Sequence, residues 1–311
     1  MSNHKTTIKS HLITTSKWFL LGSLALLSIV ALIRGFERLN DDFAMRHIQI
    51  EIPYHADWIL PAPESGEQAL INQILAQRFV YLARGHQSYV FISEDNKYVI
   101  KLLKLDRLKV NPLFSLVPLP SALENWHNKK KALKQGKLEH LLNSWQLAYT
   151  NLRNETGLIA MQIIPNNFYN QELVIIDKLG FEHRVDLNET MFLIQKKTAL
   201  LAPTINQQMI DGKEDEAKRL LAELISLYHS EYRRGIAEND SHPLRNTGVI
   251  DNHPIQIDFG QFIYDEKLHD NDFLAKELRY KTKELVRWLE KNHPSLAEYF
   301  KEIIKESFQH E

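Results

Sequence analysis

The sequence predicts an α+β protein in two parts, preceded by one membrane-spanning helix. A run of sixteen residues without a charge, 18–33, lies near the N-terminus. β-type segments then predominate from residue 78 to 195, and helical spacing of apolar residues predominates from 196 to 311. A strand-rich part followed by a helix-rich part indicates α+β architecture.

The composition is that of an ordinary globular protein, with 44% hydrophobic and 25% charged residues among 311. The net charge of -1 and the lack of a long basic block give no sign of nucleic-acid binding, so no nucleic-acid partner is expected. The chain has no cysteine, which excludes disulfides and cysteine-ligated metals.

The N-terminal apolar segment is predicted to anchor the protein in a membrane through residues 12–34, after a tail at 1–11. The uncharged run alone spans about 24 Å as a helix, short of a ~30 Å hydrocarbon core. Extension back to Leu12 makes the length sufficient if Lys17 reaches the headgroups. A signal sequence is one alternative, although no small-x-small cleavage motif is found. A buried core helix is the other, disfavoured because the segment is apolar on every face.

Residues 35–77 are predicted to form a juxtamembrane linker that ends in a short helix. The stretch LPAPESGE has the composition of a linker, and GEQALINQILAQ has helical spacing of its apolar residues. Three β-type runs follow at Phe79–Leu82, Tyr89–Ile92 and Tyr98–Leu103. The turn SEDNK between the last two predicts a hairpin.

A long, charged, helix-forming segment runs from about Ser121 to Ile159 and contains only two glycines, Gly136 and Gly157. Two β-type runs, ELVIIDKLG and ETMFLIQKKT, come next. Helical patterns then occupy EDEAKRLLAELISLYHSEYRRG, which ends at the stop signal Gly235, and the final segments DFLAKELRYKTKELVRWLEKN and SLAEYFKEIIKES.

Lys101 is the first candidate functional residue. It lies among apolar residues in YVIKLLK, where an ammonium group needs a matching charge, such as a polyphosphate. A solvent-facing lysine on an edge strand is the alternative. Glu155, late in the long helix, is the candidate partner that would hold Lys101 in place. Glu139 is a second candidate, which the sequence does not separate from Glu155.

The segment DSHPLRNTGVIDNHPIQIDFG, residues 240–260, carries the other candidates. Asp240, Asn246 and Asp258 supply a carboxylate, an amide oxygen and a second carboxylate. If they converge, they can accept a hydroxyl proton and bind Mg²⁺ through oxygen. The alternative is that Asp and Asn occur here as turn formers.

Taken in chain order, these residues resemble the protein-kinase-like superfamily over roughly residues 78–311. The resemblance implies a bilobal fold, with a β-rich N-lobe at 78–195 and a small helical C-lobe at 196–311. It also implies that a flexible loop covers ATP, here the stretch GHQSYVF with Gly85, Ser88 and Val90, whose backbone N–H groups could approach an anion.

The resemblance further implies a role for each candidate side chain. Lys101 would hold the α- and β-phosphates of ATP, and Glu155 would pair with it. Asp240 would orient the acceptor hydroxyl, and Asn246 and Asp258 would hold Mg²⁺.

The chain departs from the protein-kinase pattern in several places. Glu238 and Asn239 replace the His-Arg before the catalytic aspartate, and only Gly85 of three loop glycines is kept. No Ala-Pro-Glu follows Asp-Phe-Gly, and only about fifty residues remain after it. The short second lobe is more similar to lipopolysaccharide-sugar kinases and aminoglycoside-phosphotransferase-like members.

The expected function is therefore ATP- and Mg²⁺-dependent phosphoryl transfer to a hydroxyl of a small-molecule, saccharide or protein acceptor. Because ATP is a cytosolic nucleotide, the domain is expected on the cytoplasmic side. One alternative is a catalytically inactive, pseudokinase-like binding module tethered to the membrane. Another is an anchored α+β protein without a kinase-like fold.

Overall fold

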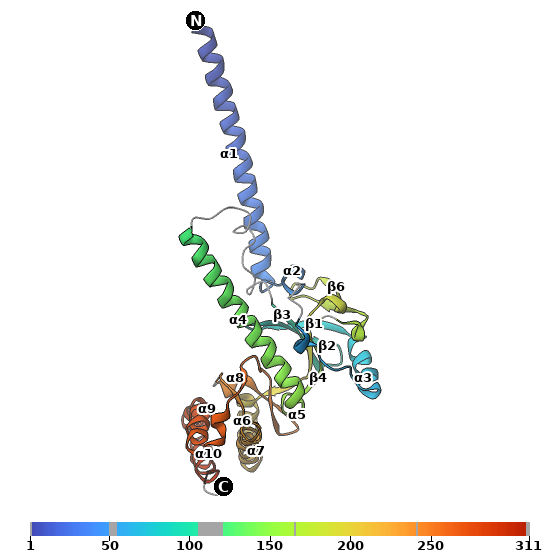
Figure 1. Cartoon of the computed structure of the whole chain (residues 1–311), viewed down its shortest axis with the longest axis vertical. Coiled ribbons are helices and arrows are strands. Elements are labelled where there is room, and N and C mark those ends of the chain that lie inside the picture. The colour runs from blue at the N-terminus through green and yellow to red at the C-terminus, as the bar shows by residue number, and fades with distance from the viewer. Residues whose placement is uncertain (1, 50–54, 105–120, 165, 241, 309–311) are drawn as a thin grey trace.

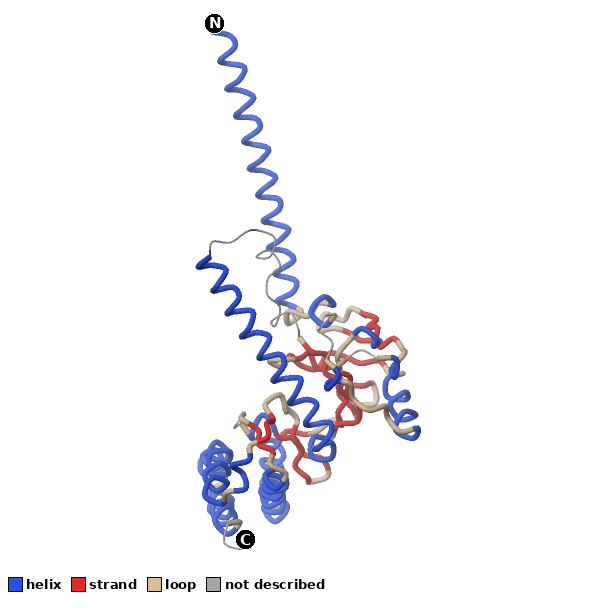
Figure 2. Tube along the Cα trace, in the orientation of Figure 1, coloured by secondary structure: helices blue, strands red, loops and turns tan. Residues whose placement is uncertain are grey.

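The computed structural model describes residues 2–49, 55–104, 121–164, 166–240 and 242–308. Its secondary structure is mixed α+β, with one long N-terminal helix that projects from the rest of the chain (Figure 1). The strands lie in the middle of the molecule, between this helix and the C-terminal helices (Figure 2). The predicted α+β class is thus confirmed.

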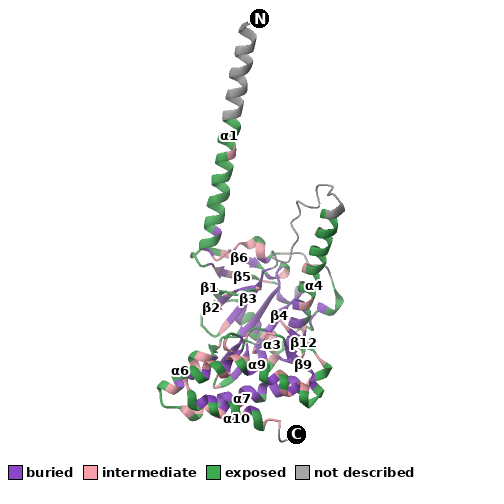
Figure 3. Ribbon diagram, turned by 90° about the vertical axis from the view of Figure 1, so that its left-hand side faces the viewer, coloured by how far each residue is buried: buried purple, intermediate pink, exposed green. Residues whose placement is uncertain are grey.

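The N-terminal helix α1 (Ser2–Leu39) is longer at both ends than the predicted span. Its stretch Trp18–Leu39 has a mean hydropathy of 2.1 and is long and apolar enough to cross a membrane. The most apolar window of this stretch is not buried against other elements (Figure 3), unlike a core helix. A helix of this kind fits a membrane anchor or a signal sequence.

The segment expected as a juxtamembrane linker instead packs on the sheet where it is described. It contains α2 (Met45–Ile48), a 3-10 turn (Ala56–Trp58) and α3 (Ser65–Leu75). Its apolar side chains join the core that lies against the strands: Phe43, Ile48, Ile71, Ile74 and Leu75. Residues 50–54 of this segment, and Met1 of the expected tail, lie outside the described residues.

A seven-stranded sheet forms the centre of the strand-rich part, in the order β4-β7-β3-β2-β1-β5-β6. The predicted hairpin and the strand before it are confirmed. The strands are β1 (Arg78–Arg84), β2 (Ser88–Ser93), β3 (Tyr98–Leu103), β4 (Leu158–Gln162), β5 (Glu172–Ile176), β6 (Glu182–Asp186) and β7 (Phe192–Lys196). All pairs are antiparallel except β1 with β5. The predicted runs ELVIIDKLG and ETMFLIQKKT form β5 and β7, which the strand order separates by three strands.

The long helix α4 (Ser121–Asn151) ends earlier than the sequence predicts. A separate turn, α5 (Arg153–Thr156), follows it and stops at Gly157, whose φ of 61° suits glycine. The C-terminal half of α4 packs with β3, β4 and β7 in one apolar cluster that also contains Phe259 and Phe262. This packing brings the Asp-Phe-Gly segment against α4.

The helix-rich part surrounds a second core built on α7, α9 and α10. Gly235 follows the end of α7 with a φ of 69°, as its predicted role as a helix stop requires. The helices are α6 (Leu201–Ile210), α7 (Glu214–Arg233), α8 (Pro243–Asn246), α9 (Asn271–Asn292) and α10 (Pro294–Glu306). The short strands are β8 (Ala199–Leu200), β9 (Ile236–Glu238), β10 (Thr247–Ile250), β11 (His253–Gln256) and β12 (Phe262–Tyr264). Within the described ranges, further 3-10 turns lie at Asn167–Tyr169, Leu187–Glu189 and Glu266–His269.

Candidate functional site

Lys101 reaches from the central strand β3 to the segment that contains Asp258. Its Nζ donates a hydrogen bond to the carbonyl of Ile257, a residue 156 positions later in the chain. It also lies 5.7 Å from the centre of the Phe259 ring. Burial lowers the pKa of Lys101, and the Asp258 carboxylate opposes that shift by favouring the charged amine. β3 has neighbours on both sides, so Lys101 is not an edge-strand lysine.

Asn246 and Asp258 stand at the open end of one hairpin. β10 and β11 pair with Thr247 opposite Gln256, and the turn at their other end is made by Asp251 and Asn252, both with positive φ. Beyond the last strand pair, the Ile257 N–H donates to the Asn246 carbonyl at 2.8 Å. The hairpin therefore holds the two candidate metal residues next to each other.

The donor set at this end of the hairpin suits Mg²⁺. Asn246 is 6% exposed, and its Nδ2 has no hydrogen-bond partner among the described residues. Asp258 is exposed. The described residues contain no group of three His, Asp or Glu side chains arranged for a metal. Mg²⁺ is commonly held by one or two protein oxygens together with substrate phosphates and water, which this pair can supply.

Asp240 follows β9, which pairs with β12 directly after Asp-Phe-Gly. The Asn239 N–H donates to the Gln261 carbonyl at 3.1 Å, which continues the ladder by one bond. The Asp240 carboxylate is 36% exposed and lies 3.6 Å from Nε2 of His242. Both Asp240 and Asp258 act on the pKa of the same neighbour, Glu238, so the two loops meet around that residue.

A buried polar cluster beneath these loops was not recognised from the sequence. Lys281 of α9 forms an ion pair with Glu238 and also donates to the carbonyls of Glu238 and Asp240. Burial raises the pKa of Glu238 to about 7, although Lys281 lowers it in part. Burial likewise raises the pKa of Glu231, on α7, to about 8. The only available signal was a lysine on the apolar side of α9, beside Leu278.

The loop between β1 and β2 lies over the Asp-Phe-Gly segment. Its Gly85 N–H donates to the Ser88 carbonyl at 2.9 Å, and Lys104 Nζ donates to the Gly85 carbonyl at 2.7 Å. A methyl group added to Gly260 would come within 2.4 Å of the Gln87 side-chain oxygen. The loop therefore contacts the segment directly through Gln87.

Two other loop residues expected to cover the nucleotide belong to β2. Ser88 is buried and opposes Leu103, while Val90 is half-buried and opposes Lys101 across the β2–β3 pair. Val90 is thus placed directly beside the lysine.

Glu155 does not pair with Lys101, and this expectation has to be corrected. The Glu155 carboxylate accepts a hydrogen bond from Arg234, which also donates to the Asn151 carbonyl. Because α4 ends at Asn151, Glu155 lies on the separate turn α5 and faces the end of α7. Glu139, the other candidate, is exposed and accepts from Gln135.

Comparison with known proteins finds no matching family model and no matching curated protein. Among solved structures, WbdD, described as a bifunctional kinase-methyltransferase, is 15% identical with a TM-score of 0.36. That match covers 72% of this chain and 46% of WbdD, so the chain spans less than half of that relative. Rv3197 of Mycobacterium tuberculosis, in a complex with erythromycin, is 18% identical, with 74% and 60% coverage and a TM-score of 0.31. Likeness at this level assigns neither a family nor an activity.

Proposed function

We propose that this protein is a membrane-anchored phosphotransferase with a protein-kinase-like catalytic domain. The observation that carries the proposal is the contact between Lys101 and the Asp258 segment, made across 156 residues of sequence. A lysine on a central strand, next to an exposed carboxylate and a buried amide, matches the parts that phosphoryl transfer requires.

Each residue has a stated role in the proposal. Lys101 neutralises charge on the phosphates of ATP, and Asp240 accepts the proton of the attacking hydroxyl or orients it. Asn246 and Asp258 provide protein oxygens for Mg²⁺, which when bound neutralises the charge that develops on the phosphates. The acceptor is a saccharide, a lipid or another small molecule in preference to a protein, because the helix-rich part is small for holding a peptide substrate.

An inactive binding module is the second candidate function, and one observation favours it. Lys101 lies against a backbone carbonyl, and neither Glu155 nor Glu139 is its partner. In an active kinase of the protein-kinase type, a glutamate on the helix beside the sheet pairs with this lysine. The phosphotransferase is expected to turn ATP over and the inactive module is not, whereas both are expected to bind the nucleotide.

The test uses the full chain in lipid nanodiscs, because apolar side chains between α1 and β1, such as Phe43, Ile48 and Ile71, belong to the core. Binding of ATP is measured with and without Mg²⁺, followed by ATP turnover. Lys101→Met should weaken Mg²⁺-dependent ATP binding by roughly tenfold or more, through the loss of one charged contact. Lys97→Met removes a lysine from the exposed turn before the same strand and should have no effect. Equal ATP affinity of wild type and Lys101→Met would contradict the proposal.

A further inference from the structure

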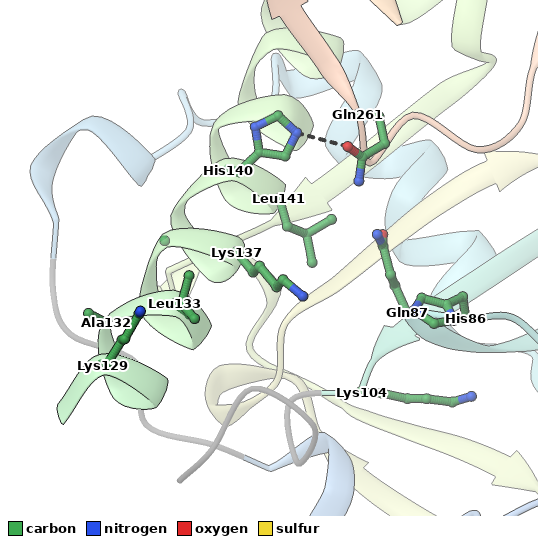
Figure 4. Close-up of a pocket in the computed structure, with 11 residues that line it drawn as sticks. His86, Gln87, Lys104, Lys129, Ala132, Leu133, Lys137, His140, Leu141 and Gln261 are labelled. Carbon is green, nitrogen blue, oxygen red and sulfur yellow. Dashed lines mark hydrogen bonds between the residues drawn. The ribbon is translucent and has the colours of Figure 1, made fainter. Parts of the chain in front are cut away.

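A cavity of about 770 Å³ lies between α4, the β1–β2 loop and the segment just after Asp-Phe-Gly. Figure 4 shows Lys137 pointing from α4 into this space, with His86 and Gln87 on the opposite side. His140 of α4 contacts Gln261, three residues after Asp258, at 3.0 Å. The cavity therefore reaches the segment that directly follows Asp-Phe-Gly, and its volume is in the range of small-molecule sites.

The charge of this cavity is positive. Every ionisable side chain that lines it, among the described residues, is a lysine or a histidine: His86, Lys104, Lys129, Lys137 and His140. Two glutamine side chains add hydrogen-bonding groups, and Leu133 and Leu141 form an apolar wall. Lysines serve as phosphate ligands in proteins, and a phosphomonoester carries a charge of about −1.5 to −2 at neutral pH.

The cavity is lined by His86 and Gln87 of the loop expected to cover ATP, but not by the lysine expected to hold its phosphates. Lys101 is not among its lining residues, and it contacts the Asp258 segment from β3. The cavity is reached from α4, on which Lys129, Lys137 and His140 follow one another at helical spacing along one side. A ligand there would lie beside Gln261, three residues after Asp258, and on the side of the loop that faces α4.

We infer that this cavity binds the phosphomonoester group of the acceptor, so that the substrate is a hydroxyl compound that is already phosphorylated. The role of the ligand as the phosphoryl acceptor rests on the proposed function. The existence of an anion-binding site in the cavity does not depend on it. The phosphate can belong to a soluble molecule or to a lipid headgroup. α4 extends from the cavity toward the same end of the molecule as α1 (Figure 1), and Leu123 and Trp126 are exposed at its N-terminal end.

The experiment measures binding of inorganic phosphate to the full chain in phosphatidylcholine nanodiscs, by phosphorus NMR titration. The double variant Lys129→Gln/Lys137→Gln should raise the Kd for phosphate by roughly tenfold or more, through the loss of two charge-assisted contacts. Lys131→Gln removes an exposed lysine of the same helix that does not line the cavity, and it should leave the Kd unchanged. All these lysines are exposed, so thermal melting should show that the variants are folded.

Binding of Mg·ATP is measured on the same three proteins and should differ by no more than about twofold, since the nucleotide lies elsewhere. A parallel loss of ATP and phosphate affinity would overturn the inference, because the cavity would then be part of the nucleotide site. Equal phosphate affinity of wild type and the double variant, or no phosphate binding by wild type, would also overturn it. If wild type does not bind Mg·ATP, the proposed function fails while the phosphate titration still tests the cavity.

A second arm identifies the source of the phosphate. The titration is repeated in nanodiscs that contain phosphatidic acid, whose headgroup is a phosphomonoester. If the lipid headgroup occupies the cavity, wild type should have a higher apparent Kd for inorganic phosphate in these discs than in phosphatidylcholine discs. In Lys129→Gln/Lys137→Gln the two kinds of disc should give the same Kd. An unchanged Kd in wild type shows a soluble group. Both results support a phosphomonoester site and differ only in the class of acceptor.

Discussion

Lys281 of α9 and Glu238 of β9 form an ion pair at 2.5 Å, with side chains only 3% and 1% exposed. The same ammonium group donates to the carbonyl of Asp240 at 3.2 Å. The pair therefore joins the helix-rich part to the loop that carries the proposed catalytic aspartate. Removing one member of such a pair leaves an uncompensated charge or polar group in the interior.

We expect Lys281→Met to lower the free energy of unfolding by about 3 kcal/mol at pH 8, because Glu238 then remains buried without a cation. The loss should be smaller at pH 5, since burial raises the pKa of Glu238 and the protonated carboxyl needs no partner. The double variant Lys281→Met/Glu238→Leu should recover at least part of the stability. The measurement is chemical denaturation at both pH values. An equal loss at pH 5 and pH 8 would mean that packing, and not charge, is responsible.

Glu231 should make the stability of the protein depend on pH. Burial raises its pKa from an ordinary value of 4.5 to about 8 in the folded state, so the folded protein binds a proton that the unfolded chain has released. The free energy of unfolding should therefore fall as the pH rises from about 4.5 to about 8. Glu231→Gln should make this dependence shallower in melting experiments across that range.

Asp215→Asn is the control for Glu231→Gln, because it removes an exposed carboxylate from the same helix. It should leave the slope between pH 5 and pH 8 as it is in wild type. A wild-type stability that rises with pH over this interval would contradict the assignment of Glu231.

Asp258→Ala should abolish Mg²⁺-dependent ATP binding or turnover while the melting temperature changes little. The Asp258 side chain is exposed, so its truncation should cost within about 0.5 kcal/mol of stability. The measurements are ATP binding with and without Mg²⁺, and thermal melting. Asp265→Ala, which removes a carboxylate that accepts from the Lys267 N–H, should affect stability without affecting nucleotide binding. Strong destabilisation by Asp258→Ala with unchanged ATP affinity would indicate a structural turn.

Glu155→Gln should leave ATP affinity unchanged and should lower stability by about 1 kcal/mol, because the partner of Glu155 is Arg234 in a partly exposed pair. Arg234→Ala should cost more, since the guanidinium also donates to the Asn151 carbonyl and to Ser230. Thermal melting and nucleotide titration check both variants. A loss of ATP affinity in Glu155→Gln with stability unchanged would indicate that Glu155 does pair with Lys101 when ATP is bound.

The proposed use of ATP places residues 41–311 on the cytoplasmic side of the membrane. The positive-inside rule permits this orientation without requiring it, because three lysines precede the apolar segment and three arginines follow it: Lys5, Lys9, Lys17, Arg34, Arg38 and Arg46. Protease added outside intact cells should leave this region uncut, and permeabilised cells provide the positive control. Digestion in intact cells would contradict the proposed topology.

Local pattern was sufficient for much of the fold. The β-type runs around SEDNK, the stop at Gly235 and the two C-terminal helices all have the predicted positions, because turn residues and apolar spacing act over a few residues. The parallel pairing of β1 with β5 and the packing of Phe43 and Ile48 on the sheet were not predicted. Both depend on contacts between segments that are distant in the chain.

By itself, the sequence determined the α+β class and the apolar N-terminal helix. It could not determine which side chains meet across the molecule. Glu155 was assigned to Lys101 because a helix was expected to continue to Ile159, but α4 ends at Asn151 and the carboxylate faces Arg234. The ion pair between Lys281 and Glu238 could not be predicted from the sequence either. The two residues are 43 positions apart, and only the packing of α9 against β9 brings them together.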